Sequence, residues 1–165
     1  MTLTAGLVAG TVANAGNDGA APVLRPRSSP AAVDLCPVPH RYRGAFEAAA
    51  SDTDLPLALL VSVAQVESNL DHAARSSAGA TGLLQVMPRT AAELRLDPSR
   101  PETNVLAGAR YLKLMMARFD SPDLALAAYN AGPTAVERVG GAPGSETLSY
   151  VANVNRVWQR LEGCS

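Results

Sequence analysis

The apolar residues of this chain recur at spacings of three and four from residue 40 almost to its end, and this periodicity limits the fold more than any other feature. Such spacing gathers apolar side chains on one face of a helix. The composition agrees, because Ala and Leu supply most of a 47% hydrophobic content that is only 4% aromatic, and these residues favour helices over sheets. We therefore expect a mainly α fold, with at most short strand pieces between residues 76 and 87.

Six helices are predicted, over residues 40–52, 55–67, 88–96, 104–119, 124–130 and 147–162. Thr53 or Asp54 is expected to cap the second helix, with Pro56 in its first turn, and Asn104 to cap the fourth. The Ala-Gly-Pro sequence at 131–133 is expected to end the fifth.

The chain of 165 residues is long enough for one domain with a core, together with a tail. Residues 1–15 are small and apolar and end in Ala-Asn-Ala, which is typical of a signal-peptide cleavage site, and residues 16–30 have the Gly, Pro and Ser content of a linker. We therefore predict a signal-like segment and linker over 1–35 and a single domain over 36–165. The alternatives for the first segment are a misassigned start codon or a merely flexible tail.

The charge balance and the absence of long apolar runs exclude several classes of protein. With 14 basic and 15 acidic residues, the chain has no global field that would recruit nucleic acid or an anionic membrane. No apolar run reaches membrane-spanning length, so an exported form is expected to lack a membrane span. A monomer is also expected.

Cys36 and Cys164, the two cysteines of the chain, bracket the predicted domain. A disulfide between them would restrict the unfolded chain by about 5 kcal/mol in the entropy model, and it would indicate an oxidising compartment. Two unpaired thiols in a cytosolic protein are the alternative. His40 and His72 match no metal-binding spacing and are interpreted as surface residues. No metal or organic cofactor is expected.

One ionisable residue interrupts the apolar periodicity. Leu57, Leu60, Ala64 and Glu67 fall on one face of the second predicted helix. Burial disfavours an ionised carboxyl and raises its pKa, which suits a general acid in the cleavage of a glycosidic bond. Taken alone, Glu67 is more simply explained as a carboxylate that reaches water at the end of a helix.

Four short sequences change that judgement because they occur together and in order: Glu67-Ser68, GATGLLQVMP at 79–88, AYNAGP at 128–133 and ETLSYV at 146–151. This set closely resembles the lytic transglycosylases with a lysozyme-like catalytic domain, over about residues 40–162. The resemblance implies a lysozyme-like fold and cleavage of the bond between MurNAc and GlcNAc in peptidoglycan. The product would be a 1,6-anhydro ring.

The same resemblance implies a role for individual residues. Glu67 matches the single catalytic acid/base, and Tyr150 the tyrosine whose hydroxyl stands near it. The residues expected to contact the glycan are Ser76, Gln85, Met87, Tyr129, Asn130 and Tyr150. The small size and signal-like start further resemble periplasmic members that open the wall for a secretion or pilus apparatus.

Two other functions remain open from the sequence. A hydrolytic muramidase on the same fold would need a second carboxylate across the cleft from Glu67, and Asp71 is the nearest acid that follows it in the chain. A non-catalytic protein that binds peptidoglycan and docks an assembly is the third possibility.

Overall fold

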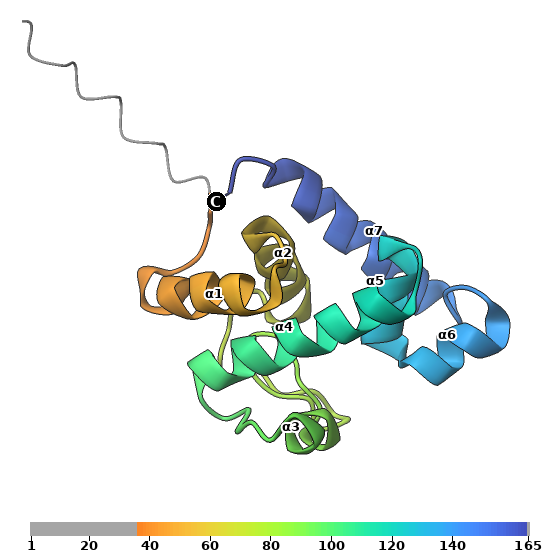
Figure 1. Cartoon of the computed structure of the whole chain (residues 1–165), viewed down its shortest axis with the longest axis horizontal. Coiled ribbons are helices and arrows are strands. Elements are labelled where there is room, and N and C mark those ends of the chain that lie inside the picture. The colour runs from red at the N-terminus through yellow and green to blue at the C-terminus, as the bar shows by residue number, and fades with distance from the viewer. Residues whose placement is uncertain (1–35, 165) are drawn as a thin grey trace, which may run out of the picture. The chain divides into compact units, whose positions relative to one another are not determined.

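The structure is a computed structural model that describes residues 36–164, and within this range it is almost entirely helical (Figure 1). Its seven helices are α1 (His40–Thr53), α2 (Leu57–Ser68), α3 (Pro88–Leu94), α4 (Pro101–Arg118), α5 (Pro122–Ala131), α6 (Pro133–Val139) and α7 (Ser145–Arg160). In the described part, β pairing is limited to two isolated bridges, Arg75 with Thr81 and Thr81 with Val86. The mainly α prediction with minimal β structure is confirmed. The predicted signal-like segment and linker lie outside the described residues.

Several predicted helix boundaries are wrong. Helix α4 begins at Pro101, so Asn104 lies inside the helix and does not cap it. Thr53 and Asp54 end α1, Asp54 with a left-handed backbone, and Pro56 is the residue that precedes α2. The short helix α6 was not predicted. Proline starts four of the seven described helices, because its fixed φ suits the first turn and its missing N–H is not needed there.

Helix α2 forms the centre of the core. All of its residues from Ala58 to Ala64 are buried, so the predicted apolar stripe is too narrow: the middle of the helix is covered on every side. It packs against α1 and α7, and Figure 1 shows it behind α1. A helix enclosed in this way fixes the position of whatever residue lies at its end, and that residue is Glu67.

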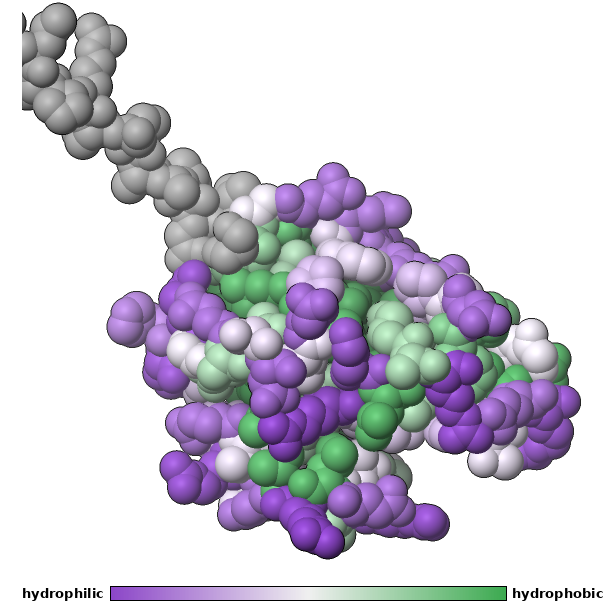
Figure 2. Space-filling view, in the orientation of Figure 1, coloured by the Kyte–Doolittle hydropathy of each residue, from purple (hydrophilic) through white to green (hydrophobic). Residues whose placement is uncertain are grey.

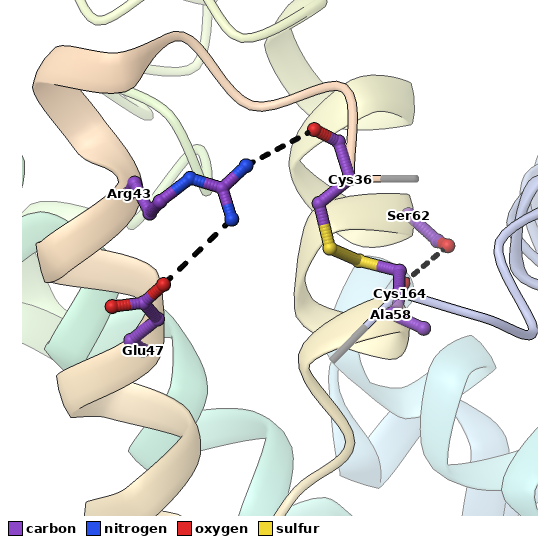
Figure 3. The surroundings of a disulfide bond; sticks show 6 residues. All are labelled: Cys36, Arg43, Glu47, Ala58, Ser62 and Cys164. Carbon is purple, nitrogen blue, oxygen red and sulfur yellow. Dashed lines mark hydrogen bonds and ion pairs between the residues drawn. A yellow bond between two sulfur atoms is a disulfide. The ribbon is translucent and has the colours of Figure 1, made fainter. Parts of the chain in front are cut away.

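A disulfide joins the two ends of the described domain. Cys36 and Cys164, both buried, are bonded across 128 residues of sequence, which confirms the predicted pairing (Figure 3). Arg43 of α1 donates to the carbonyl of Cys36 at 3.4 Å and forms an ion pair with Glu47 at 3.7 Å. The first turn of α1 is thereby tied to the same corner as the disulfide. Among residues 36–164 no helix is both long enough and apolar enough to cross a membrane.

Candidate active site

Glu67 lies in the last turn of α2, where the chain leaves the core. Asn69 and Leu70 both adopt left-handed backbone conformations, with φ of 53° and 61°, and this turns the chain away immediately after the helix. Asn adopts the left-handed region more readily than most residues, whereas this conformation is unfavourable for Leu. Glu67 is therefore held at a sharp helix end and is neither fully buried nor fully exposed.

Burial controls the acidity of Glu67. It raises the pKa of this carboxyl from 4.5 to about 7, and a polar contact with the Tyr150 hydroxyl lowers the pKa by a smaller amount. Neither cause is a second carboxylate. Near neutral pH the side chain is thus divided between its protonated and ionised forms, as a group that both gives and takes a proton requires.

Two tyrosine hydroxyls lie within electrostatic reach of Glu67. Burial raises the pKa of Tyr129 and of Tyr150 well above the ordinary value, and the charge of Glu67 raises both further. The Tyr150 hydroxyl, from α7, is buried, and no residue in the described range lies in hydrogen-bonding geometry to it. The Tyr129 hydroxyl, from α5, donates to the carbonyl of Leu84 at 2.7 Å. Tyr150 therefore keeps an unused donor beside the acid, while the donor of Tyr129 is already engaged.

The segment that faces the end of α2 is residues 79–86, which we call the glycine loop. Ser68, next to Glu67, donates from its hydroxyl to the carbonyl of Leu83 at 2.8 Å. Asn104 accepts from the backbone N–H of Leu84 at 3.0 Å and donates to the carbonyl of Thr81 at 2.8 Å. Side chains from α2, α4 and α5 therefore supply backbone partners to the glycine loop, and together they fix its position.

Two glycines allow the glycine loop to approach α4 this closely. A Cβ at Gly82 would lie 2.4 Å from Nδ2 of Asn104, and one at Gly108 would lie 2.5 Å from the Cβ of Leu84. Gly82 also has a φ of +78°, which side chains disfavour. The sequence reasoning missed this contact between α4 and the loop. The available signal was a glycine inside a helix, four residues after a polar side chain, since such a glycine often marks close packing.

A pocket of about 320 Å³, which we call the proximal pocket, brings together four of the residues expected to contact glycan. These are Gln85, Met87, Tyr129 and Asn130. Met87 is 41% exposed, which is high for a methionine and leaves its side chain available to a ligand. Glu67 and Tyr150 do not line this pocket.

Two of the expected glycan contacts also have structural partners. The side-chain amide of Gln85 donates to the carbonyls of Ala74 and Gly82. The carbonyl oxygen of the Asn130 side chain accepts from the Thr147 hydroxyl at 3.0 Å. Both side chains are thus oriented before any ligand binds.

Ser76 and Asp71 lie on the exposed loop between α2 and the glycine loop. The Ser76 hydroxyl accepts from the backbone N–H of Ala80, and Asp71 accepts from the N–H of Ala73. Neither residue lines the proximal pocket. Between Cys36 and Cys164 no three His, Cys, Asp or Glu residues are grouped so as to hold a metal ion.

Comparison with known proteins shows which family of domains the chain is similar to. Residues 44–150 match the model of the transglycosylase SLT domain. A membrane-bound lytic murein transglycosylase F from Alkalilimnicola ehrlichii is 40% identical over 100 residues, which cover 56% of this chain and 22% of that protein. The soluble lytic murein transglycosylase of Escherichia coli is 32% identical over 142 residues, which cover 70% of this chain and 22% of that protein.

A solved structure shares the fold. An inactive Glu-to-Gln mutant of the lytic transglycosylase Slt from Pseudomonas aeruginosa superposes with a TM-score of 0.66 at 28% identity, over 79% of this chain and 25% of that one. The predicted lysozyme-like transglycosylase fold is confirmed by this similarity. The chain spans about a fifth of the length of the curated relatives described here.

Proposed function

Since the chain belongs to the transglycosylase SLT domain family, we propose that it is a lytic transglycosylase that cleaves the β-1,4 bond between MurNAc and GlcNAc in peptidoglycan. The single observation that supports this most strongly is Glu67, a partly buried acid with a pKa of about 7 and no carboxylate among the causes of that pKa. The names of the relatives, lytic murein transglycosylases, point to the same substrate.

In the first step, protonated Glu67 gives its proton to the glycosidic oxygen as the bond from that oxygen to the anomeric carbon breaks. Glycoside cleavage passes through an oxocarbenium-like state, and most glycosidases use a second carboxylate to capture it or to activate water. With one acid at the site, the N-acetyl group of the muramoyl sugar supports the positive charge instead.

In the second step, ionised Glu67 takes the proton of the 6-hydroxyl of the same sugar, and that oxygen bonds to the anomeric carbon. The 1,6-anhydro ring forms, the carboxyl is protonated again, and no water is consumed. One residue thus serves as acid and then as base, for which a pKa near the working pH is suited.

The residues around Glu67 have distinct proposed roles. The unused hydroxyl of Tyr150 is suited to hydrogen-bond the ionised form of Glu67 or the acetamido group of the substrate. Met87 and the Tyr129 ring would contact sugar in the proximal pocket, and Asn130 would supply polar contacts there. Ser76 lies apart from that pocket and is proposed to contact glycan farther along the strand.

Product analysis tests the reaction directly. Purified peptidoglycan is digested with the protein and the released muropeptides are weighed by mass spectrometry. We expect anhydro ends from the wild type, and loss of about three or more orders of magnitude in rate for Glu67→Gln, because a neutral amide can neither give nor take the proton. The glutamate-to-glutamine inactivation of the Pseudomonas relative supports this expectation.

Asp71→Asn is the matched control, because it removes the nearest acid that follows Glu67 in the sequence. It should leave the rate within twofold of the wild type, as Asp71 is exposed and bonded only to its own loop. Reducing ends in place of anhydro ends would show a hydrolytic muramidase. Glycan binding without cleavage by the wild type would show a binding protein.

The cellular setting is also a proposal. We place the enzyme in an exported, periplasmic compartment, because peptidoglycan lies there and the Cys36–Cys164 disulfide requires oxidising conditions. A role in opening the wall for a secretion or pilus apparatus, which the family resemblance suggested, remains a prediction. Fractionation of the native host, followed by a gel with and without reductant, tests the compartment: a wholly cytosolic, reduced protein would contradict it.

A further inference from the structure

The two amide side chains of the proximal pocket differ in which of their polar atoms is already bonded. The nitrogen of Gln85 donates to the carbonyls of Ala74, at 3.2 Å, and Gly82, at 3.0 Å, and its oxygen makes no hydrogen bond in the described part of the chain. Asn130 is held the other way round. Its oxygen accepts from the Thr147 hydroxyl at 3.0 Å, and its nitrogen makes no hydrogen bond in that same part. A ligand therefore meets an acceptor at Gln85 and a donor at Asn130.

The orientation of the Asn130 amide depends on the start of α7. Thr147 lies in the first turn of this helix and is only 6% exposed. Figure 1 shows α7 beside α5, the helix that carries Asn130 in its last turn. A hydroxyl can bond either end of an amide, but the N-terminus of a helix carries a partial positive charge and favours the oxygen. The hydroxyl and the helix end thus select the same orientation.

Asn130 needs such an anchor because its side chain is exposed. Figure 2 shows mostly hydrophilic residues on the lobe that carries α6, the helix that follows Asn130 in the chain. Water at such a surface bonds both ends of an amide, so a free Asn side chain would rotate between two orientations, and only one of them presents the NH2 group to the pocket. A buried hydroxyl that holds the oxygen removes the other.

We propose, on the premise of the proposed function, that Thr147 is a positioning residue, whose hydroxyl orients Asn130 so that its NH2 group meets an acceptor oxygen of the sugar in the proximal pocket. Thr147 does not line this pocket, so it acts through Asn130 and not on the sugar itself. Glu67 does not line it either, so the contact is made away from the reacting bond. Its loss should therefore raise KM and leave kcat nearly unchanged.

The test is a double-mutant cycle between Thr147 and Asn130, with kcat and KM measured on glycan oligomers of peptidoglycan. Thr147→Val keeps the shape of the side chain and removes the hydroxyl. We expect it to raise KM about three- to tenfold, the range of one hydrogen bond, with kcat within about twofold of the wild type. Thr147→Ser, which keeps a hydroxyl, should behave as the wild type. In an Asn130→Ala background, Thr147→Val should have no further effect, because the residue that it orients is absent.

Asn130→Asp tests the direction of the contact. Asp keeps an oxygen that accepts from the Thr147 hydroxyl but lacks the NH2 group, so KM should rise at least as much as in Asn130→Ala. Both variants are compared at pH 5, where Glu67 is protonated. Because Asn130 is exposed, this variant needs no repacking of the core, and it decides the matter if Thr147→Val unfolds. Ser149→Ala, which removes a hydroxyl at an exposed position on α7, is the matched control and should leave KM unchanged.

Three results would overturn the inference while leaving the proposed function in place. An equal effect of Thr147→Val in the wild type and in Asn130→Ala would mean that Thr147 acts through another residue, such as Tyr150, one turn further along α7. A wild-type KM in Thr147→Val would mean that the hydroxyl is not needed. A wild-type KM in Asn130→Asp would mean that the sugar donates to Asn130. Failure of the wild type to cleave the oligomers would refute the proposed function, and this inference with it.

Discussion

Replacing Glu67 by Gln should stabilise the folded protein, by an amount that increases with pH. Burial moves the pKa of this carboxyl from 4.5 to about 7. Each pH unit of such a displacement corresponds to about 1.4 kcal/mol. The ionised carboxylate is therefore disfavoured in the fold, relative to the unfolded chain, by about 3 kcal/mol.

The sign of the pH dependence follows from the order of the two pKa values. Below pH 4.5 the carboxyl is protonated in both states, and its ionisation costs the fold nothing. Between pH 4.5 and about 7 the unfolded chain releases the proton while the folded protein retains it, so the free energy of unfolding falls. Above about pH 7 both states are ionised and the loss is complete. The expected loss is about 1 kcal/mol at pH 5 and about 3 kcal/mol at pH 8.5.

The assay is urea unfolding of the wild type and of Glu67→Gln at pH 5 and pH 8.5, with the disulfide intact. Other titrating groups are common to both proteins, so the change in their stability difference between the two pH values isolates Glu67. That change should be about 2–3 kcal/mol in favour of Gln. Glu146→Gln, at an exposed position on α7, is the matched control for replacing a carboxyl by an amide. If the wild type and Glu67→Gln differ in unfolding free energy by the same amount at both pH values, the claim that burial disfavours ionised Glu67 is refuted.

Three further predictions concern the fold and the pH dependence of the reaction. Above about pH 7 the rate should fall about tenfold per pH unit, because only protonated Glu67 starts the reaction; a rate that stays level to pH 9 would contradict this. Changing Cys36 and Cys164 together to Ser should lower the free energy of unfolding by about 2–5 kcal/mol, and urea midpoints equal to those of the wild type would argue against it. Gly108→Ala should destabilise the protein by about 1–3 kcal/mol by overpacking, whereas Gly44→Ala, where nothing lies within 4 Å of the new Cβ, should stabilise it by up to about 1 kcal/mol, as thermal unfolding would show.

The sequence was sufficient to predict most of the helices, because apolar spacing reports which face a helix buries. Tyr42, Phe46 and Ala49 lie on the predicted face of α1 and are buried, and the same holds for Tyr150 and Val154 on α7. The disulfide was predicted for a comparable reason, since two cysteines at the limits of a domain have a single pairing. These features depend on local pattern or on simple counting.

Helix boundaries were harder to predict, because the polar residues that define them also serve distant contacts. Asn104 has the chemistry of a cap, but it is 1% exposed, and its amide holds the glycine loop, about twenty residues earlier in the chain. Helix α6 was missed because its seven residues carry a single buried side chain, Val136, and no periodicity is visible in so short a segment. In both cases tertiary contacts decide what the local sequence leaves open.

The two tyrosines at the site also differ in a way that depends on tertiary contacts. Tyr129 and Tyr150 are both aromatic residues in short sequences that resemble the family, and only that resemblance distinguishes them, because it implies that Tyr150 lies near the acid. The structure separates them: the hydroxyl of Tyr129 is engaged by the carbonyl of Leu84, whereas that of Tyr150 is buried beside Glu67 without a full hydrogen bond. Which donor remains unused depends on the path of the glycine loop, which no helical pattern encodes.

The end of α2 that carries Glu67 and the glycine loop are joined by a hydrogen bond from the neighbouring Ser68. A carboxylate that costs about 3 kcal/mol at alkaline pH would lower that cost if the segments covering it could move aside and admit water. Hydrogen bonds from Ser68, Asn104 and Tyr129 hold the glycine loop from three different helices, and each of them would be lost in such a movement. Movement of the loop is therefore costly, and through Ser68 the end of α2 that carries Glu67 is held together with it. Because the same loop supplies Gln85 to the proximal pocket, the contacts that hold the end of α2 also fix where the sugar would bind.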